Sequence, residues 1–179
     1  MEFINIFNNI LYVLTTLGSI AIIIFLLGFL YVRFSSKKKT KKIRVLWDKI
    51  SRNALGYAFG IALIATLGSL FYSEIAGFQP CPLCWYQRIF MYPLSIILGV
   101  AWYVKDKAIG RYTLTLSIIG FLIGLYHYLI QRTGGGICLG EGECTFIYVL
   151  GLEFISIPYM AMTAFLLIAI FSYVSLRKN

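Results

Sequence analysis

Long runs of apolar residues dominate the chain and alternate with short polar segments. A helix that crosses a bilayer core of ~30 Å needs about 20 residues, and five runs reach that length. These runs are Ile10–Val32, Ala54–Ser73, Trp85–Val104, Tyr112–Gln131 and Ile157–Leu176. Only the third contains a charged residue, Arg88, and only the fourth contains the single histidine, His127. The pattern predicts five transmembrane helices.

The connecting segments divide these helices into two parts. A basic linker, 33–53, follows the first helix, whereas short loops join the other four. Short connections favour an antiparallel bundle. We therefore expect an all-α integral membrane protein: a four-helix transmembrane bundle (54–179), preceded by one additional transmembrane helix and its basic linker (1–53). Basic residues follow the first run and none precede it, so we expect a retained helix rather than a signal peptide.

Composition and charge agree with a membrane protein and indicate its orientation. Of 179 residues, 60% are hydrophobic and only 13% are charged, about half the charged fraction of a soluble domain. The net charge is +9, and all but two of the 16 lysines and arginines fall in 33–52, 105–111 and 177–178. Basic segments remain cytoplasmic. We therefore expect a multi-pass cell-membrane protein with its N-terminus and both cysteine-bearing loops outside and its C-terminus in the cytoplasm.

The basic run KKKTKK at 37–42 raises the question of a nucleic-acid partner. The expected position of this run beside a transmembrane helix favours an orienting role and attraction to anionic lipid instead. The other loops carry Glu74, Glu141, Glu143 and Glu153 but only one basic residue, Arg132. We expect the lipid bilayer as a partner and no nucleic acid.

All four cysteines lie in the two loops that are expected outside the membrane. Cys81 and Cys84 precede the third helix, and Cys138 and Cys144 lie between the fourth and fifth. Buried apolar cysteines would be scattered through the helices, so that interpretation is disfavoured. Two static disulfides and a four-thiolate zinc site remain alternatives to a redox role, although no pattern of zinc ligands recommends a metal.

The stretch CPLCWYQR at 81–88 favours reactive cysteines. Pro82 suits the first position of a helix, which would make Cys81 the N-cap and place Cys84 in the first turn. A helix N-terminus and a nearby cation both stabilise a thiolate. Arg88 follows Cys84 by four residues and so lies on the same helix face. An arginine within the membrane is a functional candidate, and the competing interpretation is that it extends to the lipid headgroups.

A dithiol that becomes oxidised must pass two electrons to an acceptor. The chain has no glycine-rich dinucleotide fingerprint and little mass outside the membrane, so a lipid-soluble quinone is the acceptor that we expect. Arg88 would stabilise negative charge on the ring oxygens. His127 could reach the same level of the membrane, or it could be only a hydrogen-bonded packing residue.

Several motifs, in order along 54–179, resemble the DsbB/BdbC family of membrane thiol:disulfide oxidoreductases, and most closely its BdbC-like branch. They are CPLCWYQR with the following IFMYPL, YHYLIQ at 126–131, the cysteine pair of the last loop, and LEFISIPYMAMTAF at 152–165. The additional first helix departs from the four-helix bundle of that family.

The resemblance implies an electron relay. An extracytoplasmic thiol oxidase with a thioredoxin fold (DsbA/BdbD-like) would reduce Cys138–Cys144, with Cys138 the attacked cysteine. That pair would reduce Cys81–Cys84, and Cys84 would pass the electrons to ubiquinone or menaquinone from the membrane pool. Arg88 would activate the quinone, with His127 and Gln131 supporting its site. The alternative is a non-catalytic membrane scaffold or metal-binding accessory with structural cysteines.

Overall fold

The computed structural model describes residues 2–34, 41–138 and 144–176, and within these ranges the chain forms helices joined by loops and one isolated β-bridge. Part of the basic run (37–40), the acidic residues Glu141 and Glu143, and the basic tail 177–178 lie outside the described residues. In order, the helices are α1 (Glu2–Phe34), α2 (Lys41–Arg52), α3 (Ala54–Leu70), the π-helical turn η1 (Phe71–Ile75), α4 (Pro82–Val104), α5 (Gly110–Thr133) and α6 (Ile157–Leu176).

Five of the described helical spans are long and apolar enough to cross a membrane, as the sequence predicts. The last begins and ends at the predicted residues, and α3 continues into η1 to complete the second span. The other four spans extend beyond their apolar runs, and α1 does so by the most. The structure therefore has the expected all-α class, with a four-helix bundle and one additional N-terminal helix.

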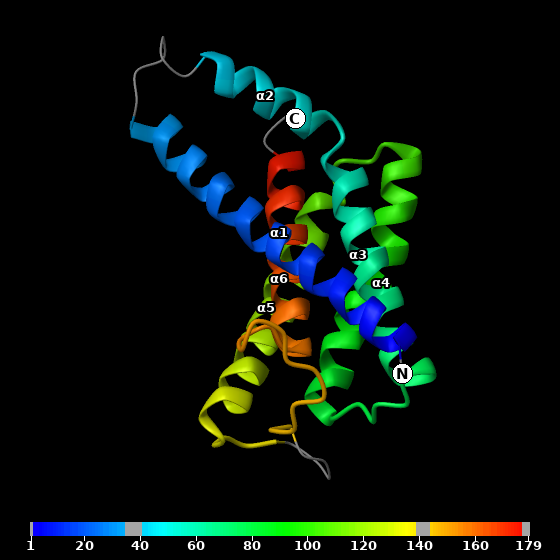
Figure 1. Ribbon diagram of the computed structural model, residues 1–179. Coiled ribbons are helices and arrows are strands. Elements are labelled where there is room, and N and C mark those ends of the chain that lie inside the picture. Colours follow the sequence, from blue (N-terminus) through cyan, green and yellow to red (C-terminus); the bar gives the residue numbers. More distant parts are fainter. Residues whose placement is uncertain (1, 35–40, 139–143, 177–179) are drawn as a thin grey trace.

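The helices α3 to α6 form a closed ring in which each packs against the next and α6 returns to α3 (Figure 1). Their shared core contains nine buried residues from α3, α4 and α6: Leu55, Ala58, Ala62, Met91, Leu94, Leu98, Ala101, Phe165 and Ile168. Small residues allow the closest approach, as is common between membrane helices. A side chain at Gly120 of α5 would overlap the ring of Phe165 in α6.

Part of the expected basic linker before α3 is helical, which the sequence analysis did not predict. In α2, Trp47 stacks on Phe25 of α1, with ring centroids 4.8 Å apart, and also on Phe29. Ser51 donates a hydrogen bond to the carbonyl oxygen of Val174 in α6. The helix was missed because its apolar positions are few and its stability depends on these tertiary contacts.

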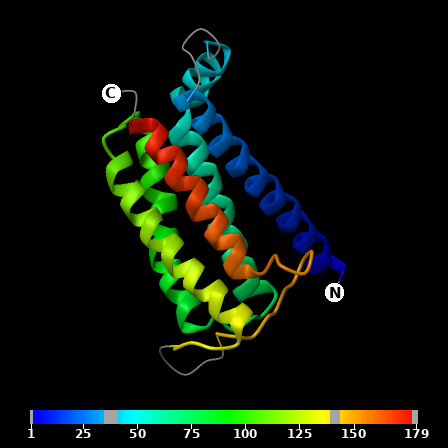
Figure 2. The ribbon, with the colours of Figure 1, turned by 90° about the vertical axis from the view of Figure 1, so that its left-hand side faces the viewer.

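The additional helix α1 lies obliquely across the side of the bundle formed by α3 and α6 (Figures 1 and 2). Its N-terminal end lies at the same end of the molecule as the start of α4 and the loop between α5 and α6. Its other end points toward the opposite end of the molecule, where α2 lies and α6 ends (Figure 1). Both described cysteine pairs therefore belong to one end of the bundle.

Candidate active site

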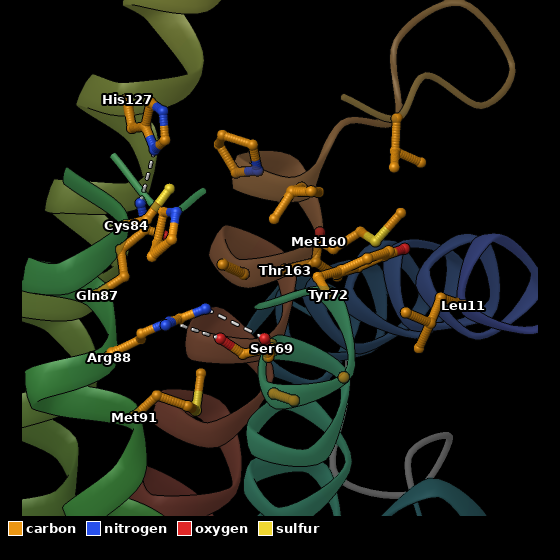
Figure 3. A pocket seen from close by; sticks show the side chains of 18 of the residues that line it. Leu11, Ser69, Tyr72, Cys84, Gln87, Arg88, Met91, His127, Met160 and Thr163 are labelled. Carbon is orange, nitrogen blue, oxygen red and sulfur yellow. Dashed lines mark hydrogen bonds between the residues drawn. The ribbon is translucent and has the colours of Figure 1, made fainter. Parts of the chain in front are cut away.

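A cavity of about 250 Å³ lies near the cysteine-bearing end, among α1, α3, η1, α4, α5 and α6. Most of its lining is apolar, as in most small-molecule sites. Polar side chains enter the lining from α3, α4 and α5: Ser69, Cys84, Gln87, Arg88, His127 and Gln131. Figure 3 shows Cys84, Gln87, Arg88 and His127 on one side of this space.

Cys81 and Cys84 stand at the start of α4, where the sequence placed them. Cys81 is the N-cap and its sulfur accepts a hydrogen bond from the backbone N–H of Cys84 at 3.3 Å, with Pro82 beginning the helix. The two Sγ atoms are 2.9 Å apart, and both cysteines are free thiols in this structure. The pair is therefore close enough to exchange a proton or to form a disulfide.

His127 joins the thiol pair to a second polar side chain. Its Nε2 lies 3.6 Å from the sulfur of Cys81, and its Nδ1 lies 2.9 Å from Nε2 of Gln87. An amide nitrogen only donates, so Nδ1 is the acceptor and the proton of the neutral ring lies on Nε2, facing the sulfur. His127 and Gln87 are both buried. The imidazole is thereby oriented as a hydrogen-bond donor to Cys81.

The surroundings of Cys81 favour its thiolate. The hydrogen bond from the Cys84 thiol holds the pKa of Cys81 well below its ordinary value, and His127 lowers that pKa further, against the opposing effect of burial. Cys81 lies just outside the membrane-spanning part of α4. A thiolate, rather than a thiol, is the nucleophile in disulfide exchange.

Arg88 faces α3 from one turn below Cys84. Its Nε donates to Oγ of Ser69 at 3.0 Å, and its Nη2 donates to the backbone carbonyl of the same residue at 3.1 Å. The hydroxyl of Tyr92 lies 3.3 Å from that Oγ, and the guanidinium lies 5.2 Å from the ring centre of Trp85. Arg88 is thus held within the wall of the cavity by neighbouring side chains (Figure 3).

Cys138 and Cys144 are joined by a disulfide, with Cα atoms 5.9 Å apart. Cys144 is buried with Leu83 of α4 and Ile130 of α5, and both Cys138 and Cys81 pack against this small cluster. The two cysteine pairs therefore share one set of apolar neighbours. The disulfide also differs from the four-thiolate zinc alternative, because two of the four sulfurs are bonded to each other.

Gln131 lies one turn beyond His127 and lines the same cavity. Its Nε2 donates to the carbonyl oxygen of Phe146 at 2.9 Å, which ties α5 to the last loop. Its Oε1 is buried and has no hydrogen-bond partner among the described residues. The amide therefore holds the loop and leaves one acceptor unused beside the cavity.

Sequence reasoning missed Ser69 and Gln87 as members of this site. Both are polar residues within apolar helical runs, which is the signal that could have found them. Gln87 also lies three residues after Cys84, on the same helix face. Which residues they contact depends on how α4 packs against α3 and α5, and the chain order does not reveal that.

The comparison with known families agrees with this geometry. A sequence profile of the family described as "Disulfide bond formation protein DsbB" matches residues 51–175. The chain belongs to the DsbB family, a class of all-helical membrane oxidoreductases of disulfide bond formation. The resemblance inferred from the motifs is thereby confirmed.

Individual relatives are similar over most of their own length. The chain is 44% identical to "Probable disulfide formation protein C 1" of Bacillus anthracis over 136 residues, which cover 74% of this chain and 98% of the relative. It is 45% identical to "Probable disulfide formation protein" of Oceanobacillus iheyensis over 148 residues, covering 80% and 97%. It is 50% identical to "Disulfide bond formation protein C" of Bacillus subtilis over 115 residues, covering 62% and 83%. No solved structure matches the chain.

Proposed function

We propose that this protein reoxidises an extracytoplasmic thiol oxidase of thioredoxin fold and passes the electrons to a membrane quinone, which supports disulfide bond formation in exported proteins. The observation that carries the proposal is that Cys84 and Arg88 line one cavity, and that Cys81, which pairs with Cys84, is within hydrogen-bond distance of His127. This arrangement places a reactive thiol pair beside a largely apolar cavity within the membrane-spanning bundle, where a quinone could bind.

The first half of the reaction is disulfide exchange at the surface. A dithiol of the partner attacks the Cys138–Cys144 disulfide, Cys138 first, so that the partner leaves oxidised and this pair becomes a dithiol. That dithiol then reduces a Cys81–Cys84 disulfide by the same in-line attack. The shared apolar cluster around Leu83 and Ile130 supports this second step, because both pairs contact it.

The second half of the reaction takes place at the cavity. Cys81 and Cys84 give up two electrons and two protons as their disulfide forms, and these convert the quinone to quinol. The Cys81 thiolate stabilised by His127 is one of the two reacting sulfurs, and Cys84 lines the cavity itself. A bound quinone would supply the two-electron acceptor.

The residues of the cavity suit a quinone head group. The Nε and Nη2 groups of Arg88 donate hydrogen bonds to Ser69. Its Nη1 has no hydrogen-bond partner among the described residues, so one charged donor remains for an oxygen of the quinone ring. The unused Oε1 of Gln131 would accept from a quinol hydroxyl. The volume of about 250 Å³ is close to the lower end of small-molecule sites, roughly 300 Å³. These groups would hold the ring, whereas the exchange chemistry belongs to the cysteines.

The test measures quinol formation by the purified protein with a reduced thioredoxin-fold oxidase and a quinone. We expect no quinol from Cys84→Ser. Arg88→His should reduce the rate about tenfold to a hundredfold, because a charge-assisted hydrogen bond contributes about 1.5–3 kcal/mol. Arg132→His is the matched control, since Arg132 is exposed and bonds to the backbone of Glu153 outside the cavity.

A further variant separates the two halves of the relay. Cys138→Ser should block reduction by the protein partner, yet quinol should still form when a small dithiol reduces Cys81–Cys84 directly. Equal rates in the wild type, Cys84→Ser and Arg88→His would refute the proposed function.

A second candidate function is metal binding without catalysis. The sulfurs of Cys81 and Cys84 and a ring nitrogen of His127 lie within 4.8 Å of one another, a set that a soft metal ion could share. The two functions are distinguished by metal analysis of the reduced protein. Stoichiometric zinc that survives dialysis and protects both thiols from alkylation would favour the metal-binding accessory.

A further inference from the structure

The additional helix α1 lies outside the part of the chain that matches the family. The family profile begins at residue 51, and the Bacillus anthracis relative is covered over 98% of its length by 74% of this chain. Nothing in the relay proposed above uses α1. Its contacts with the bundle nevertheless lead to the same cavity.

The N-terminal third of α1 is fixed to the turn that ends the second membrane span. Phe7 stacks on Phe71 of η1 with ring centroids 3.6 Å apart. The hydroxyl of Tyr72 donates to Oδ1 of Asn8 at 2.9 Å. Tyr72 lies between α1 and the cavity and is part of the cavity lining. These contacts therefore connect α1 to the cavity wall.

The middle of α1 is fixed to α6. The hydroxyls of Ser19 and Tyr159 are 3.2 Å apart. Gly18 lies so close to Leu167 that an added Cβ would be 3.0 Å from its side chain. Between these two attachments, one helix face is held over the bundle.

That face supplies three residues of the cavity wall, Leu11, Leu14 and Thr15. Figure 3 shows Leu11 on α1 beyond Tyr72, across the cavity from Cys84 and Arg88. Leu14 lines the cavity and is also 42% exposed on the apolar surface of the protein. At α1, the wall of the cavity is therefore also part of the apolar outer surface of the protein.

We propose that α1 forms the membrane-side wall of the acceptor site, where Leu11 and Leu14 contact the hydrocarbon tail of the quinone as it leaves the cavity for the bilayer. The inference rests on the proposed function and deepens it. The side of the cavity formed by α4 and α5 carries its charged residue, Arg88, together with Gln87, His127 and Gln131, which suits the ring. The α1 residues offer two leucines and one threonine, which suit a hydrocarbon chain.

The test compares quinones with and without a tail on the full-length protein. We expect Leu11→Trp and Leu14→Trp to raise the KM for a quinone with a long isoprenoid tail about tenfold, equivalent to about 1.4 kcal/mol. The KM for the tail-less ring compound should not change. Leu17→Trp is the matched control, because Leu17 lies on the same helix, is 57% exposed and is absent from the cavity lining.

A second readout does not depend on turnover or on a variant that folds. A quinone analogue with a photoreactive diazirine in its tail should label a peptide from residues 2–32 of the wild-type protein. Excess untailed ring compound should not increase the labelling of that peptide, and it lowers the labelling where it displaces the head group. Labelling confined to α3 and α6, or an equal KM change for both quinones in Leu11→Trp, would overturn the role of α1. A wild-type protein that reduces neither quinone would refute the proposed function instead.

Discussion

Cys81 and Cys84 share one turn of helix, yet their surroundings differ. Both line the cavity, but Cys81 is the N-cap, accepts from a backbone N–H and faces His127, whereas Cys84 lies in the first turn, one turn from Arg88. The residue nearer the surface is thus the one whose thiolate is stabilised. This division suits a pair that receives electrons from one side and passes them to the other.

The reactivity of Cys81 should depend on pH in a way that reports this environment. Because its pKa is lowered, Cys81 should be a thiolate at pH values between that lowered pKa and the ordinary cysteine pKa of about 8.5. An unperturbed cysteine is a thiol in the same pH range. In the reduced protein, we expect its alkylation rate, followed by mass spectrometry, to reach half-maximum well below pH ~8.5.

Removal of the imidazole should move that midpoint in a known direction. His127→Phe takes away one of the groups that lower the pKa of Cys81, so its half-maximum should move to higher pH. Tyr126→Phe is the control, since Tyr126 hydrogen-bonds to the backbone of Ile137 and does not line the cavity. A half-maximum that is the same in the wild type and His127→Phe would contradict the role given to His127.

At the scale of the elements, α5 and α6 approach each other at a position without a side chain. A Cβ at Gly120 would overlap the ring of Phe165, which is fully buried. Gly120→Ala should therefore force the two helices apart and lower the stability by about 1–3 kcal/mol, the usual cost of overpacking. Thermal unfolding in detergent measures this change.

Gly28→Ala provides the comparison for that measurement. Gly28 lies in α1 with nothing within 4 Å of an added Cβ, and alanine favours a helix over glycine by about 1 kcal/mol. We expect no loss of stability from it. A Gly120→Ala protein as stable as the wild type would show that the α5–α6 contact is less close than described.

The sequence predicted the elements better than it predicted their contacts. Each membrane span was visible because about 20 consecutive apolar residues leave few alternatives. Cys81, Pro82 and Cys84 were placed correctly because capping is local. In contrast, α2 depends on Trp47 packing against α1, and the pairing of Arg88 with Ser69 depends on how two helices meet. Interactions between distant segments are not encoded in any short stretch.

At the scale of the whole molecule, the basic segments predict one orientation in the membrane. Reporter fusions should show the loops that follow α3 and α5 outside the cell, and the loop that follows α4 and the C-terminus in the cytoplasm. A phosphatase active only outside and a β-galactosidase active only inside measure this directly. Phosphatase activity at the C-terminus would contradict the orientation, and the loop after α4 serves as the internal control.

The cavity takes part of its lining from α1 and part from α6, the first and last of the described membrane-spanning helices. A ribosome makes α1 before α4 and makes α6 after it. The thiols of α4 therefore enter the membrane before the space beside them has its full boundary. Each newly made molecule gains a complete site only when α6 is inserted, so a product truncated before α6 carries the Cys-Pro-Leu-Cys motif without the enclosure around it.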